Sequence, residues 1–172
     1  MRERFGADVA QTVADLLVRR GETVAVAESS AGGLVSAALV SRVGASAWFV
    51  GGVVPYGASV RRQWLGVEPR DGGAVSASMA GALAEAVRER TGATWGVGET
   101  GIAGPQLGRR SLKAAGLGYV AVSGPGRTVV EVIETGVDDR AENQEAFANA
   151  ALSLLARVLS QTHVAETPSS SA

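Results

Sequence analysis

Hydrophobic and polar positions along the chain follow helical and strand patterns in alternation, and no linker or internal repeat divides them. Apolar residues at helical spacing over about 7–20, with Gly21 after them as a stop signal, predict a first helix. The continuous apolar run at 23–27 is typical of a strand that is covered on both faces. We therefore expect this strand to pass through the polar turn 28–33 into a second helix that begins near Leu34.

The rest of the chain predicts further strands, three more helices and a late hairpin. Serine caps, glycine stops and glycine-proline turns mark the ends of these elements. The expected ranges are a strand over 48–54 with a break at the glycine pair 51–52, a short helix through 61–65, a helix from a serine cap at 76 or 78 to Gly92, a strand over 94–98, a hairpin of 117–123 and 128–133 across 124–126, and a helix over about 139–160 that Asp138 or Asp139 caps.

Strands that alternate with helices and end in a hairpin predict an α/β fold, namely a three-layer α/β/α sandwich around a mixed β-sheet. We expect one domain over residues 1–160. The polar residues 161–172 predict a disordered tail.

The composition, 46% hydrophobic and 19% charged over 172 residues, fits one domain with a full core. A net charge of -1 with dispersed arginines gives no electrostatic footprint for nucleic acid, so we expect a small-molecule partner. No apolar run approaches the roughly 20 residues of a spanning helix, which predicts no membrane partner. The absence of cysteine and of an apolar leader indicates a cytoplasmic location.

Two polar segments follow predicted strands and are the candidate sites. Turn 28–33 offers the hydroxyls of Ser29 and Ser30 and a glycine pair, and segment 99–105 leaves the third strand in the same sense. Ligands of open α/β sheets bind beyond the carboxyl ends of strands, so both segments line one cleft if the strands are neighbours. Either segment alone is more simply a helix cap or turn, but their joint occurrence favours a site.

Few side chains in this sequence can act as a base. The one histidine, His163, is close to the tail, and the one lysine is Lys113. This inventory excludes a Ser-His-Asp triad, and the spacing of the carboxylates matches no metal motif, so we expect neither metal nor cofactor. Taken alone, Tyr56 is most simply a half-buried aromatic residue and Arg61 part of a solvated face.

Five motifs in order make the chain similar to a known family, the CinA carboxy-terminal domain, which is the nicotinamide mononucleotide deamidase family. The similarity runs in register from about Val9 to Leu159. The motifs are residues 27–33 (AESSAGG), 51–56 (GGVVPY), 65–67 (LGV), 73–76 (GAVS) and 100–105 (TGIAGP).

The resemblance implies a metal-free amidohydrolase that converts nicotinamide mononucleotide to nicotinate mononucleotide and ammonia, without a cofactor, and it implies a homo-oligomer. The family nucleophile corresponds to Ser29, Tyr56 matches an active-site tyrosine, and backbone N–H groups would hold the oxyanion. The substrate-binding positions that it implies are Glu28, Ser30, Gly32, Gly33, Thr100, Gly101, Gly104, Lys113 and Arg140.

The chain departs from the family pattern at the site itself. Typical members carry a lysine base five residues after the tyrosine, where this chain has Arg61, and arginine cannot accept a proton at physiological pH. Gln144 replaces an arginine, and a threonine hydroxyl is missing from turn 28–33. Three hypotheses remain: a hydrolase in which Arg61 stabilises negative charge, a catalytically silent domain that binds a nucleotide or a protein, and a purely structural module.

Overall fold

A five-stranded mixed sheet organises the chain, of which the computed structural model describes residues 6–105 and 112–162. The strand order is β2-β1-β3-β4-β5. β1 (Val24–Glu28) pairs in parallel with β2 (Phe49–Val53) and β3 (Trp95–Gly101), whereas β4 (Leu117–Gly124) and β5 (Arg127–Glu134) form an antiparallel hairpin beside β3.

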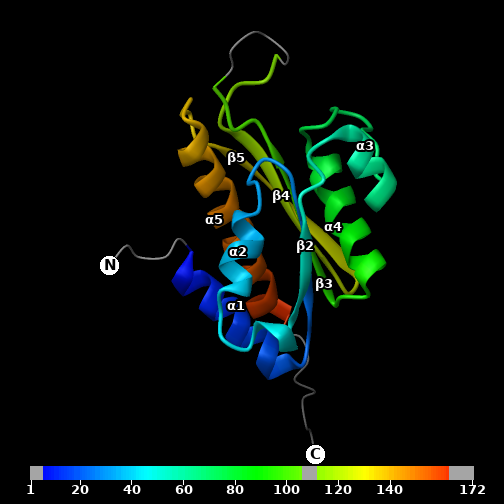
Figure 1. The fold of residues 1–172 in the computed structure, drawn as a ribbon, viewed down its shortest axis with the longest axis vertical. Coiled ribbons are helices and arrows are strands. Elements are labelled where there is room, and N and C mark those ends of the chain that lie inside the picture. The colour runs from blue at the N-terminus through cyan, green and yellow to red at the C-terminus, as the bar shows by residue number, and fades with distance from the viewer. Residues whose placement is uncertain (1–5, 106–111, 163–172) are drawn as a thin grey trace, which may run out of the picture.

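Helices cover both faces of the sheet, so the predicted three-layer α/β/α architecture is confirmed (Figure 1). On one face lie α1 (Ala7–Arg20), α2 (Leu34–Val40) and α5 (Arg140–Thr162). The other face carries the short α3 (Ala58–Val60), the π-helical turn η2 (Arg61–Leu65) and α4 (Ala77–Thr91), and the 3-10 turn η1 (Ala45–Ala47) precedes β2. Among the described residues, no helix combines the length and the hydropathy that crossing a membrane requires.

Local signals set the helix ends as predicted. Gly21 closes α1 and Gly92 closes α4, both in the left-handed conformation that glycine tolerates. The Ser76 hydroxyl accepts the Met79 N–H at the start of α4. At the start of α5, the Asp139 carboxylate accepts the N–H of Glu142.

The two faces of the sheet have different cores. Beneath α1, α2 and α5 the alternate residues of β1 and β3 are large, and Phe147 of α5 is completely buried there. On the α4 face β3 carries Gly96 and Gly98, and a Cβ at Gly98 would lie 2.1 Å from the Ala80 carbonyl oxygen. Helix α4 therefore approaches β3 more closely than any residue other than glycine would allow at these positions.

The structure differs from the sequence-based expectation in three places. β2 runs through the glycine pair as one strand, with a shift of register against β1 between Phe49 and Gly51 in place of the predicted break, and the missing Cβ of Gly52 leaves room for Ser36 of α2. β3 continues to Gly101, since hydrogen bonds satisfy the buried polar side chains of Glu99 and Thr100. α5 extends two residues past the predicted end, and the rest of the predicted tail lies outside the described residues.

Candidate functional site

The two predicted turns meet at the carboxyl edge of the sheet. β1 and β3 are parallel neighbours with Glu28 opposite Glu99. The Ser29 N–H continues this ladder by donating to the Glu99 carbonyl oxygen at 3.2 Å. The two segments are therefore adjacent, as the prediction of one shared site requires.

The Glu28 carboxylate is completely buried and points at the start of α2. It accepts the N–H groups of Gly33, Val35 and Ser36 at 2.9–3.1 Å and the Ser36 hydroxyl at 2.6 Å. Charge-assisted bonds of this kind satisfy the otherwise unpaired N–H groups of a helix N-terminus. Glu28 thus fixes the second half of turn 28–33 against α2.

The Glu99 carboxylate fixes the first half of the same turn. It accepts the N–H groups of Ser29 and Ala31, each at 2.9 Å, and the hydroxyl of the buried Ser30. Burial raises the pKa of Glu99 to about 7, although these hydrogen bonds oppose the rise. Glu99 therefore changes its protonation state near neutral pH.

Two N–H groups of the turn remain available. Ser29, Ala31 and Gly33 donate to the two carboxylates, whereas Ser30 and Gly32 donate to no acceptor in the described part of the chain. The half-buried Ser29 makes no side-chain hydrogen bond within those residues either. The turn thus offers an unengaged hydroxyl beside unengaged donors, the combination that acyl transfer requires.

Helix α5 carries polar groups to the rim of this edge (Figure 1). Arg140 donates to the Gly104 carbonyl oxygen at 3.0 Å and to the Tyr56 hydroxyl at 3.3 Å. One helical turn later, the Gln144 amide donates to the Ser30 carbonyl oxygen at 3.0 Å. Residues four apart lie on one face of a helix, so α5 joins the rim formed by Tyr56 and Gly104 to turn 28–33.

Arg61 is buried, with 7% of its surface exposed, and is not on a solvated face. This corrects the interpretation that the residue alone suggested. Its Nε is enclosed without a hydrogen-bond partner, and among the described residues its guanidinium makes no hydrogen bond or ion pair. Among the described residues, no hydrogen bond joins Arg61 to Ser29.

Lys113 holds the segment before α4. Its ammonium donates to the carbonyl oxygens of Gly72 and Val75. Thr100 donates to the carbonyl oxygen of Ala74, between these two. These bonds direct the Lys113 side chain to segment 72–75, so the geometry gives no support for Lys113 as a replacement base for Ser29.

Gly101 has a packing role. A Cβ there would lie 2.7 Å from the Phe147 ring and 2.9 Å from the Ser30 hydroxyl oxygen. Its lack of a side chain brings Phe147 and turn 28–33 together over the end of β3.

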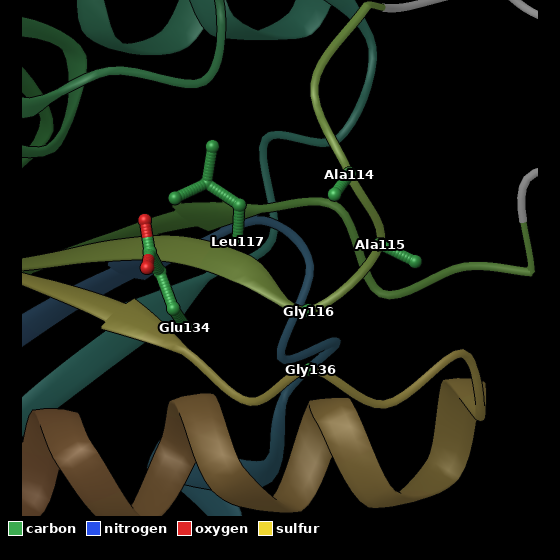
Figure 2. Close-up of a pocket in the computed structure, with 6 residues that line it drawn as sticks. All are labelled: Ala114, Ala115, Gly116, Leu117, Glu134 and Gly136. Atoms are coloured by element: carbon green, nitrogen blue, oxygen red, sulfur yellow. The ribbon is translucent and has the colours of Figure 1, made fainter.

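A hollow of about 340 Å³ lies beside the start of β4 and contains no predicted site residue. Figure 2 shows that Glu134 is the one charged residue among those that line it. Within 6–105 and 112–162, no group of three or more histidine or acidic side chains could hold a metal ion.

Sequence reasoning missed Glu99 and Gln144 as residues that position the turn. A charged residue directly after the buried strand 95–98 was the available signal for Glu99. No local signal identified Gln144, because its partner lies 114 residues away in the chain.

Comparisons with known proteins agree with the fold. A model of the CinA C-terminal domain matches residues 6–159. A CinA-like protein of Gloeobacter violaceus is 43% identical over 138 residues, which cover 77% of this chain and 32% of that relative. A CinA-like protein of Acidobacterium capsulatum is 43% identical over 158 residues, covering 90% of this chain and 37% of the relative. The chain spans about a third of the length of these curated relatives.

Solved structures are similar over nearly the whole chain. The competence/damage inducible protein CihA from Agrobacterium tumefaciens is 31% identical with a TM-score of 0.82, over 92% of this chain and 99% of that one. A competence or damage-inducible protein from Enterobacter asburiae shares the fold, with a TM-score of 0.84 at 24% identity, over 91% of this chain and 99% of that one. With its ordered motifs, its mixed sheet and these matches, the chain belongs to the CinA C-terminal domain family.

Proposed function

We propose that this chain is an amidohydrolase of the CinA type that cleaves the carboxamide of nicotinamide mononucleotide or a related compound. One observation carries the proposal: the unengaged Ser29 hydroxyl lies beside the unengaged N–H groups of Ser30 and Gly32 at the carboxyl end of β1. This combination supports acyl transfer, in which a hydroxyl attacks a carbonyl carbon and N–H donors stabilise the resulting oxyanion.

In the proposed reaction the Ser29 oxygen bonds to the carboxamide carbon, the hydroxyl proton passes to the amide nitrogen, and the C–N bond breaks to release ammonia. Water then attacks the acyl-enzyme, which releases the acid and returns a proton to the Ser29 oxygen. The Ser30 and Gly32 N–H groups donate to the oxyanion, and one such donor contributes about 3–4 kcal/mol in well-studied hydrolases. Tyr56, oriented by Arg140, is proposed to bind the substrate at the rim.

A second candidate function is ligand binding without hydrolysis. Two observations favour it: Arg61 stands where typical members have the lysine base, and Lys113 donates to two carbonyl oxygens. Without a base, the Ser29 hydroxyl is a weak nucleophile.

Ammonia release from nicotinamide mononucleotide distinguishes the two functions. We expect measurable release by the wild-type chain, a loss of about 100-fold or more in Ser29→Ala, and a gain in Arg61→Lys, which restores a titratable amine. Asp8→Asn, on the exposed surface of α1, is the matched control and should leave the rate unchanged. Absence of release by both the wild type and Arg61→Lys would refute the hydrolase proposal.

A further inference from the structure

The buried Arg61 guanidinium is a cation for which the described protein supplies no anion. The side chain is 7% exposed, Nε is enclosed without an acceptor, and no carboxylate pairs with the group. Its neighbour Arg62 is the natural contrast, since it is exposed and pairs with Glu68 at 3.3 Å.

An unpaired buried cation destabilises a folded chain, and arginine cannot relieve the cost by losing its proton. Buried charges in proteins are therefore paired or ligated. Within the described residues the donors of Arg61 are unused, so they are available to an anionic ligand.

Core packing places η2, which begins at Arg61, on the same face of the sheet as Ser29. Ala25 and Ala27 of β1 pack with Leu65 on the α4 face, and strand alternation puts Ser29 on that same face. The chain passes from the end of β2 at Val53 through Tyr56 at the rim and then enters η2, which begins at Arg61 and ends at Leu65. Arg61 is thus the first residue of the helical turn that follows the rim residue Tyr56 on this face.

We propose that Arg61 makes the site at Ser29 a carboxylate receptor, which binds the acid form of its ligand in preference to the carboxamide. The inference rests on the proposed function in one respect, namely that the carboxylate or carboxamide group of the ligand lies beside Ser29. It does not require hydrolysis.

Hydrogen-bond chemistry gives the direction of the preference. A guanidinium presents N–H donors in a planar fork, and a carboxylate offers two charged acceptor oxygens that match the fork. A carboxamide offers one neutral acceptor oxygen. Its NH₂ group is a donor and would face the N–H donors of the guanidinium without forming a hydrogen bond. Replacing the family lysine by Arg61 therefore favours the acid over the amide.

Isothermal titration with nicotinate mononucleotide and nicotinamide mononucleotide tests this proposal, because the two probes share their phosphate and ribose and differ at the carboxyl group alone. We expect the wild type to bind the acid at least about tenfold more tightly than the amide. In Arg61→Gln this ratio should fall to about one, through weaker binding of the acid. The matched control Arg62→Gln, which removes an exposed arginine, should keep the wild-type ratio.

Arg61→Gln removes a buried charge that has no acceptor, so this variant should fold. If it does not fold, Arg61→Lys supplies the comparison. Lysine lacks the planar fork, so the ratio of acid to amide affinity should fall at least about threefold in that variant. Equal affinity of the wild type for acid and amide would overturn the proposal. An equal loss of affinity for both mononucleotides in Arg61→Gln would also overturn it, because the guanidinium would then bind the phosphate that the two probes share. Failure of the wild type to bind either probe would overturn it as well.

The ammonia assay separates this inference from the proposed function. Ammonia release without an acid preference would reject the carboxylate receptor and keep the hydrolase. An acid preference that depends on Arg61, without ammonia release, would keep the receptor and reject hydrolysis.

Discussion

At the scale of single residues, two buried carboxylates determine the shape of the candidate site. Glu28 accepts four hydrogen bonds from the start of α2, and Glu99 accepts three from the residues around Ser29. Buried acids are tolerated when donors surround them in this way. The position of Ser29 therefore depends on acids that need not touch a ligand.

The raised pKa of Glu99 predicts a stability that depends on pH. The pKa is about 7 in the folded chain against an ordinary value of 4.5, so between these values the folded chain holds the extra proton. The free energy of unfolding therefore falls as pH rises through this window, by about 3 kcal/mol in total. Glu99→Gln cannot titrate and should lack this decline.

Urea unfolding of wild type and Glu99→Gln between about pH 5 and about pH 8 measures the difference. The exposed Glu85→Gln is the control and should follow the wild type. A wild type that gains stability relative to Glu99→Gln as the pH rises would contradict the assignment.

At the scale of elements, the packing of α4 against β3 positions segment 72–75, to which Thr100 and Lys113 donate hydrogen bonds. Gly98 makes this fit possible, because a Cβ there would meet backbone atoms of α4, the Ala80 carbonyl oxygen at 2.1 Å and the Ala84 nitrogen at 2.6 Å. Backbone atoms cannot turn aside as a flexible side chain can. The helix would have to move as a unit.

Gly98→Ala should therefore destabilise the chain by about 3 kcal/mol or more, as measured by urea unfolding. Gly81→Ala in α4 is the matched control, since its Cβ would make only ordinary contacts at 3.8 Å with Thr128 and Val130. There the helix propensity of alanine should stabilise the chain by about 0.5–1 kcal/mol. Equal effects of the two substitutions would argue against this packing.

At the scale of the whole molecule, the sheet has two edges, β2 and β5. Val132 on β5 is 58% exposed, and an edge strand with exposed apolar side chains is a site of association. From the sequence alone, Trp48 and Trp64 are expected to be exposed aromatic residues that favour association. Trp48 is buried, which corrects that expectation, and Trp64 is exposed.

We expect a homo-oligomer in solution that uses the β5 edge. Sedimentation velocity should give a multiple of the chain mass for the wild type, and a shift toward the monomer for Val132→Lys, because a charge on an edge strand opposes pairing. Val43→Lys, at a fully exposed position, should keep the wild-type mass. A monomeric wild type would contradict the expectation.

Much of the fold was predictable because its signals are local. The helix stops at Gly21 and Gly92, the cap at Ser76 and the hairpin turn at Pro125 depend on neighbours within a few residues. Alternation of strands and helices then leaves few topologies open.

The sequence by itself determined the element order, the location of turn 28–33 and the absence of a lysine at position 61. Only the tertiary structure decided what each polar group does: that Glu99 holds the N–H groups on either side of Ser30, that Gln144 holds the Ser30 carbonyl, and that Arg61 is buried without an anion. These roles depend on burial and on partners tens of residues away in the chain, which spacing does not encode.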